Sequence, residues 1–209
     1  MSFIRIPGGR HAIGWRFDEL LSAEVNAGLE SFVPRTEFLV RFSEAREVEL
    51  PAFEIAAQTR EAEALLGDLD DERLEELSTL EDLCNALDDA LRPEGLRLPT
   101  EDELEAAFGG RLFPWGTEVP DGDPWPNKTA FTGHQMPIES GLHPNPNPYQ
   151  VEITRHAFKL GDGGEALCGA YPWPVAWMAL SPSYRLAGDD VEDLLFEFLE
   201  EARVRPVRL

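Results

Sequence analysis

The side chains best suited to chemistry in this chain are two thiols, Cys84 and Cys168. A thiolate is a nucleophile and a ligand for soft metal ions, so a cysteine can support either catalysis or metal binding. Cys168 follows the glycine-rich turn GDGG at residues 161–164, within the stretch GDGGEALCGAYPW. Two cysteines so far apart do not indicate a disulfide framework. The chemistry open to the chain therefore depends on whether either thiol is exposed.

Cys168 has apolar sequence neighbours and no cation beside it, because Ala166, Leu167, Gly169 and Ala170 surround it. Apolar surroundings raise the pKa of a thiol and make it inert. The local sequence therefore favours burial and a structural role for Cys168. An exposed thiol that takes part in chemistry is the alternative.

Cys84 lies in a segment with helical periodicity, STLEDLCNALDDALR at residues 78–92. One stripe of this segment carries its apolar side chains: Leu80, Leu83, Cys84, Leu87 and Leu91. Asp82, Asp88 and Asp89 lie off that stripe. The spacing predicts an amphipathic helix that buries Cys84 as a small hydrophobic residue.

The histidines are scattered through the chain, at His11, His134, His143 and His156. They form no His-x-x-x-His-x-Glu pattern, so the sequence carries no compact metal motif. His134 and His143 share one long loop, where folding could bring them near Glu139 or Asp123. Isolated loop histidines usually face solvent or bond to backbone groups, and we therefore assign no metal ligands.

The chain is strongly acidic, with 40 Asp and Glu residues against 18 Lys and Arg residues and a formal net charge of −22. Such a charge repels phosphate backbones and anionic membrane surfaces, which argues against nucleic-acid and lipid partners. Acidic helix faces in solvent account for this excess, and a basic protein or peptide partner is the alternative. No apolar run approaches the roughly 18 residues that span a bilayer, and MSFIRIPGGRHAIGW lacks the apolar core of a secretion signal. We therefore expect a cytoplasmic protein.

The length fits one domain built from short elements. FIRIPGG predicts a strand closed by a turn, and EVELPAFEIA predicts two strands around Pro51. Thr100 and Glu103 form a capping-box pattern at the start of a short helix, which a glycine pair ends. Residues 117–149 are rich in Pro, Gly and Asn and predict a long loop. VEITRHAFKL then predicts one strand, and VRPVRL predicts a closing strand.

Several segments occur in an order that resembles the formylglycine-generating enzyme, or sulfatase-modifying factor, family. The most specific is RLPTEDELEAAFGG with the FPWG that follows it. The others are IRIPGGRHAIG, VELPAFEIA, Asn127 in PNKTAF, PNPNPYQV, GDGGEALC and VRPVRL. The resemblance implies a C-type-lectin-like α+β fold, loop-rich and low in regular secondary structure, over a single domain of residues 1–209.

The resemblance also implies an activity and a cofactor. Members of the family convert a cysteine of a sulfatase peptide to formylglycine, with oxygen and a copper ion held by two thiolates. Gly163 and Gly164 precede Cys168 at the spacing of the first of those thiolates. By the same spacing the second falls at Trp173, which cannot bind a metal. Since soft Cu(I) needs at least two soft ligands, we predict that this chain has lost the copper-dependent oxidase activity.

We therefore predict a binding or accessory module that keeps the scaffold, with a protein or peptide partner. Its binding face would be residues 117–149 and 165–185, with candidate aromatic anchors at Trp125, Tyr149, Tyr171, Trp173 and Tyr184. Packing in the core is the other interpretation of each aromatic side chain. The alternative function is an oxygen-dependent oxidoreductase that acts on a peptide or small thiol through Cys168 or a His/acid metal site assembled by the fold.

Overall fold

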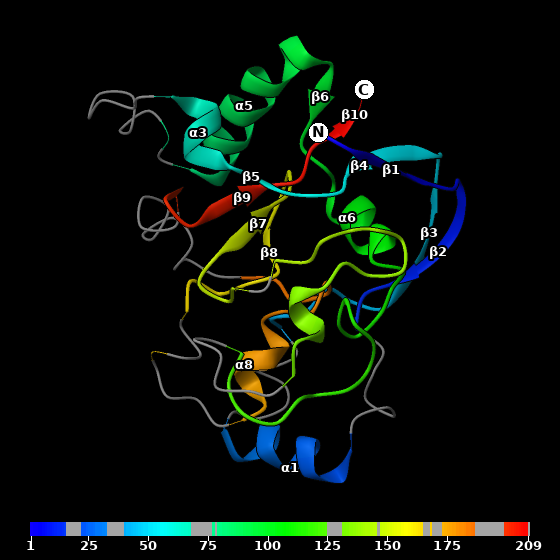
Figure 1. Ribbon diagram of the computed structural model, residues 1–209, viewed down its shortest axis with the longest axis vertical. Helices are drawn as coiled ribbons and strands as arrows, with labels where there is room; N and C mark the ends of the chain where they lie inside the picture. Colours follow the sequence, from blue (N-terminus) through cyan, green and yellow to red (C-terminus); the bar gives the residue numbers. More distant parts are fainter. Residues whose placement is uncertain are drawn as a thin grey trace.

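The computed structural model of the chain describes residues 1–15, 22–32, 40–67, 77, 79–124, 131–145, 147–164, 168, 173–186 and 199–208. Its elements are short and mix helices with strands (Figure 1). The helices are α1 (Ala23–Phe32), α3 (Ala62–Leu66), α5 (Leu80–Leu91), α6 (Glu101–Ala107) and α8 (Val175–Met178), with single 3-10 turns η1 (Arg92–Glu94) and η2 (Gly133–Gln135). None of the helices in this part of the chain is long and apolar enough to cross a membrane.

The described strands form three small sheets. One has the order β1 (Phe3–Ile6), β4 (Phe53–Ala56), β10 (Val207–Arg208) and β6 (Leu96–Arg97). Another has the order β5 (Arg60–Glu61), β9 (Ala202–Val204), β7 (Val151–Ile153) and β8 (Phe158–Lys159). The third is the antiparallel pair of β2 (Gly9–Ile13) and β3 (Arg46–Leu50). The architecture is α+β, as the sequence predicts.

The prediction of two strands around Pro51 is confirmed, and the prediction of one strand in VEITRHAFKL is partly wrong. Two strands, β3 and β4, flank Pro51 as expected. VEITRHAFKL forms two strands rather than one, because a turn separates β7 from β8. The Thr154 hydroxyl accepts a hydrogen bond from the Ala157 amide at 3.1 Å and donates one to the Ala157 carbonyl at 2.8 Å. A threonine hydroxyl that bonds the backbone three residues further on favours a turn over a continuous strand.

Helix α5 follows the predicted stripe, with one exception. Leu83, Cys84, Leu87 and Leu91 are buried, and the Thr79 side chain caps the helix by accepting from the Asp82 amide. The exception is an acid that lies off the stripe but is buried. Asp88 is only 8% exposed, because one carboxylate oxygen accepts from the Leu98 amide at 2.6 Å and the other from the Arg155 guanidinium. Off-stripe acids are therefore not all solvated, and Asp88 ties α5 to two neighbouring segments.

Helix α6 begins with the predicted capping box. The Thr100 hydroxyl accepts from the Glu103 amide at 3.1 Å, and the Glu103 carboxylate accepts from the Thr100 amide at 2.9 Å. Gly109 and Gly110 follow the helix with φ angles of +72° and +57°, a region that glycine occupies without strain. The sequence therefore specifies both ends of this helix.

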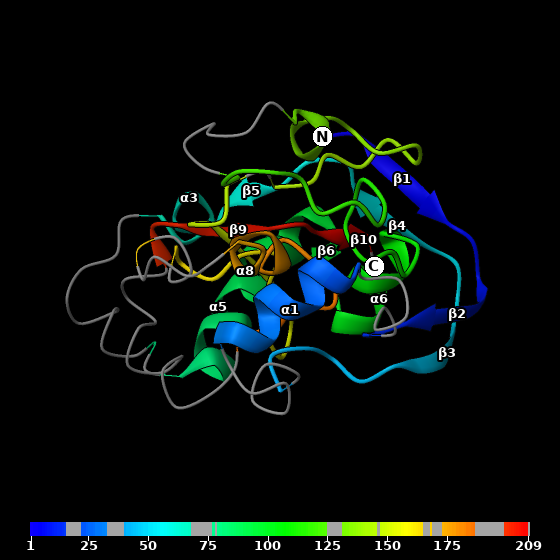
Figure 2. The same ribbon diagram turned by 90° about the horizontal axis from the view of Figure 1, so that it is seen from below.

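The acidic side chains of α6 point inward and meet cations from distant parts of the chain. Figure 2 shows α6 beside β2 and β3, and Arg46 of β3 is one of its partners. The ion pairs are Glu101 with Lys159 and Arg185, Asp102 with Arg46, Glu103 with Arg97, and Glu105 with Lys159. The many acidic residues of α6 suggest a helix in solvent. Their ion pairs instead hold the helix inside the molecule.

Glu105 is the most enclosed of these carboxylates. It accepts from the Gly14 amide at 2.7 Å, from the Ser43 hydroxyl at 2.6 Å and from Lys159 Nζ at 2.9 Å. The Lys159 side chain is itself fully buried, and its second partner is Glu101 at 3.0 Å. Because buried charges are costly unless they are paired and hydrogen-bonded, this geometry requires all of these segments to pack together.

The same network keeps Glu101 ionised. Burial disfavours its charged form, but Lys159 and a hydrogen bond from Arg185 outweigh burial and lower the pKa of Glu101 below its usual value. A lowered pKa in the folded state means that the pairing stabilises the fold above the pKa of the unfolded chain. That contribution is lost as the pH falls through the folded pKa.

A second buried ion pair joins the C-terminal segment to β7. The Arg205 and Glu152 side chains are both fully buried and make two hydrogen bonds, at 2.9 and 2.7 Å. The other Arg205 donors reach the carbonyl oxygens of Ala56, Ala57 and His143, so all five of its N–H groups have acceptors. This arginine fixes the end of β4 and the loop at residue 143 against the second sheet.

Replacing Glu105 by alanine should lower the free energy of unfolding by about 3–5 kcal/mol, because Lys159 then loses a buried counter-charge. Urea denaturation measures the change. The matched control is Glu118→Gln, in an exposed loop, which should change the stability by less than about 0.5 kcal/mol. A loss below about 1 kcal/mol for Glu105→Ala would show that the network is not needed for the fold.

Candidate functional site

Cys168 is exposed, so the prediction that it is buried is wrong. Its sulfur lies 3.4 Å from the Tyr149 hydroxyl oxygen, and its amide donates to the Gly164 carbonyl at 2.8 Å. The apolar sequence neighbours of Cys168 therefore do not determine its exposure. The structure thus favours the alternative for Cys168, an accessible thiol.

The GDGG turn positions Tyr149 and Cys168 relative to each other. The amides of Asp162 and Gly164 both donate to the Pro148 carbonyl, at 3.0 and 3.2 Å. A Cβ atom on Gly164, where φ is +82°, would lie 2.2 Å from the Tyr149 ring, so only glycine fits against that ring. Both amides are therefore bonded to Pro148, and the turn places the phenol beside the thiol.

The neighbouring thiol affects the ionisation of Tyr149. Its hydrogen bond to Cys168 raises the pKa of the phenol, with a smaller effect from burial. The phenol therefore keeps its proton at neutral pH and can donate it to the sulfur. The arrangement offers an exposed sulfur with one hydroxyl partner.

Cys84 is buried in the core, as predicted. It is 5% exposed and its sulfur lies 3.3 Å from the Thr154 carbonyl oxygen, to which the S–H donates. Burial, followed by the nearby Asp88 charge, raises the pKa of this thiol to about 12. Cys84 is therefore a protonated thiol at neutral pH, without nucleophilic character.

The two thiols lie at opposite ends of β7. Cys84 contacts Thr154, which follows the strand, while Cys168 contacts Tyr149, which precedes it. Cys84 is buried in the core, whereas Cys168 is exposed, so the two thiols lie in different environments.

Three of the predicted aromatic anchors lie in the described part of the chain: Tyr149, Trp173 and Tyr184. Tyr184 is a core residue, 3% exposed, which packs edge-on against Phe42 at 5.5 Å, so its assignment as an anchor is wrong. Trp173 is half-buried, and its indole N–H donates to the Pro120 carbonyl at 2.6 Å. Tyr149 is half-buried beside Cys168. Trp125 and Tyr171 lie outside the described residues.

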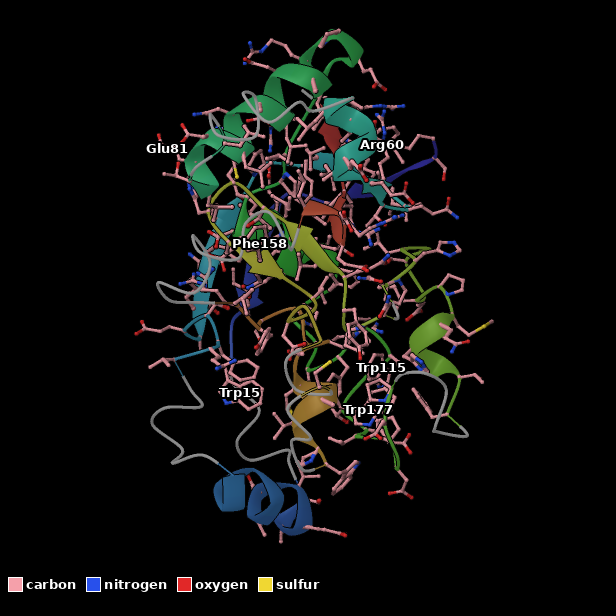
Figure 3. The ribbon with its side chains drawn as sticks, turned by 90° about the vertical axis from the view of Figure 1, so that its left-hand side faces the viewer. Trp15, Arg60, Glu81, Trp115, Phe158 and Trp177 are labelled. Carbon is pink, nitrogen blue, oxygen red and sulfur yellow. The ribbon has the colours of Figure 1, made fainter. Side chains whose placement is uncertain are left out.

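His134 occupies an aromatic cluster that the sequence did not reveal. It is 1% exposed, with the rings of Trp177, Phe131 and Trp115 at 5.2, 6.0 and 6.3 Å. Figure 3 shows Trp115 and Trp177 lying together in this cluster. Burial lowers the pKa of His134, so the imidazole is neutral at pH 7. It is a core residue rather than a solvent-facing one.

The proposed partners of a His/acid metal site do not come together. Glu139 is exposed and pairs with Arg111 at 3.5 Å, and His143 is also exposed. Within the described ranges, no three His, Cys, Asp or Glu side chains are grouped so that they could hold a metal ion.

A cleft of about 450 Å³ lies elsewhere, between α5 and the β7–β8 turn. Its lining residues in the described part of the chain are Leu80, Glu81, Cys84, Asn85, Asp88, Arg155 and His156. Figure 3 shows Glu81 in the upper part of the molecule and Trp115 and Trp177 in its lower half. The sequence signal for this cleft is the spacing of Glu81, Asn85 and Asp88, which places three polar side chains on one face of the helix.

No family model matches the chain, and no curated protein matches it.

A thiol reagent added to the native protein should label one cysteine quickly, Cys168, and reach Cys84 only after denaturation. Ellman's reagent, read before and after addition of guanidinium, measures both thiols. Cys168→Ser should remove the fast phase, and Cys84→Ala, the matched control, should leave it unchanged. Two fast thiols, or a fast phase that survives Cys168→Ser, would contradict the assigned environments.

Proposed function

We propose that this chain is a formylglycine-generating-enzyme-like domain of C-type-lectin-like fold that has lost copper-dependent oxidase activity and acts as a binding module. The family resemblance and the α+β architecture of short elements joined by long loops support the scaffold. The aromatic cluster around His134, which packs the loop at residues 131–136, is in keeping with such a fold.

The observation that carries the proposal is the placement of the sulfur ligands. A copper oxidase of this family needs two thiolates at one ion, and Cys168 lacks a second. Trp173 stands at the second position, and its indole N–H is already bound to the Pro120 carbonyl. Cys84 is held in the core at the far end of β7. The residues present therefore do not fit a bound Cu(I) ion.

Because the copper oxidase is excluded in this proposal, the function proposed for the domain is to bind a protein or peptide. The net charge of −22 favours a basic partner, because the field of the whole protein attracts cations and repels anions. On the predicted face, Cys168 is exposed, and the candidate anchors Tyr149 and Trp173 are half-buried.

A second candidate function rests on the exposed thiol. Cys168 is accessible and the Tyr149 hydroxyl lies 3.4 Å from its sulfur. In an oxygen-dependent reaction, Cys168 and a thiol of a peptide or small molecule would join in a disulfide. Molecular oxygen would take up the two electrons and two protons and form hydrogen peroxide.

Restoring the second thiolate tests the main proposal. Wild-type protein should bind no stoichiometric Cu(I) against a competing chelator, whereas Trp173→Cys should bind about one Cu(I) through paired thiolates. Spectrophotometric competition titration measures the binding. Trp115→Cys, at another tryptophan of the fold, is the matched control and should bind none. Tight stoichiometric copper on the wild type would contradict the loss of the oxidase, and no gain in Trp173→Cys would contradict the family-like placement.

A further inference from the structure

We propose that the cleft between α5 and the β7–β8 turn binds a lysine side chain of a partner protein. This inference rests on the proposed binding function and assigns it a site and a partner chemistry. The cleft volume of about 450 Å³ falls in the range of ligand pockets, roughly 300–1,000 Å³.

The charges of the cleft leave one carboxylate for a ligand. Asp88 is occupied, because it accepts from the Leu98 amide and the Arg155 guanidinium. The same ion pair takes up the charge of Arg155, whose backbone amide is fixed by the Pro99 carbonyl at 3.0 Å. Glu81 is exposed and has no ion pair within the described residues. The cleft therefore carries an unmatched negative charge at its rim.

The arrangement of acceptors suits an ammonium group. Glu81 and Asn85 are four residues apart on α5, so a carboxylate and an amide oxygen lie on one face of the helix. Lysine presents three donors on a compact head, which can satisfy separate acceptors of this kind. A ligand carboxylate would meet the charge of Glu81, which has no ion pair within the described residues, and would be repelled.

The floor of the cleft suits the stem of the same side chain. Leu80 and the Cys84 thiol line it, and the high pKa of Cys84 keeps that thiol neutral. Lysine buries its methylene groups against apolar surface while its charged head stays at the rim. The apolar floor thus fits the methylene stem of a lysine, and the acidic rim fits its ammonium group.

The openness of the cleft favours a side chain of a large partner over a free small molecule. Glu81, Asn85, Arg155 and His156 are all exposed around it. Pockets for free small molecules usually enclose most of the ligand. A side chain presented by a partner needs no such enclosure, because contacts outside the cleft hold it in place.

Short capped peptides of the form Gly-Gly-X-Gly-Gly, with X as lysine, norleucine or glutamate, test this assignment. Titration of full-length ¹⁵N-labelled protein should shift the amide signals of Glu81, Asn85 and Arg155 with the lysine peptide. Glu81→Gln should weaken that binding by about threefold to fivefold, and the effect should shrink in high salt. Glu24→Gln is the matched control, because Glu24 is an exposed glutamate in the first turn of α1.

Weaker binding by Glu81→Gln could also result from misfolding, so a second variant is chosen that should bind more tightly. Asn85→Asp adds a carboxylate at the rim and should tighten the lysine peptide by a similar factor. Equal or tighter binding of the norleucine or glutamate peptide would overturn the proposal, as would binding that Glu81→Gln leaves unchanged. Binding of free n-butylamine as tight as that of the lysine peptide would overturn the partner-protein source. Because the copper titration uses none of these residues, failure of the proposed function would appear there independently.

Discussion

The fold depends on a lysine that is fully enclosed with its counter-charges. Lys159 sits between Glu101 and Glu105 of α6, and Glu105 also holds the Gly14 amide and the Ser43 hydroxyl. The four segments that meet there come from the first quarter, the middle and the last third of the sequence. Since an unpaired charge at this depth would cost several kcal/mol, the segments must assemble together or not at all.

The same assembly determines where the two thiols lie. Strand β8 carries Lys159, and its partner β7 carries Glu152, which is locked to Arg205 by a second buried pair. Strand β7 is thus held between β8 and β9, and its two ends lie in different environments. Cys84 meets one end in the core, and Cys168 meets the other at the surface. The buried ion pairs thus fix the strand whose two ends lie next to the contacts of the two thiols.

The parts of the fold that local physics specifies could be predicted from the sequence. Thr100 and Glu103 marked the start of α6, and the leucine stripe placed Cys84 in the core. Where contacts with residues distant in the sequence determine whether a side chain is buried, the local sequence gave the wrong expectation. Asp88 is buried because Leu98 and Arg155 meet it, and Cys168 is exposed although its neighbours are apolar. The spacing of Glu81, Asn85 and Asp88 indicates only the helix side of the cleft, because its other side is the distant β7–β8 turn.

We propose that Cys84 and Cys168 cannot hold one copper ion between them. The most direct test of this proposal is to incubate the protein with oxygen, a thiol reductant, Cu(I) and a peptide that contains one cysteine. Mass spectrometry of the peptide then measures conversion of its thiol to an aldehyde. The account predicts no conversion above that of copper alone. Catalytic conversion that requires both Cys84 and Cys168 would contradict it.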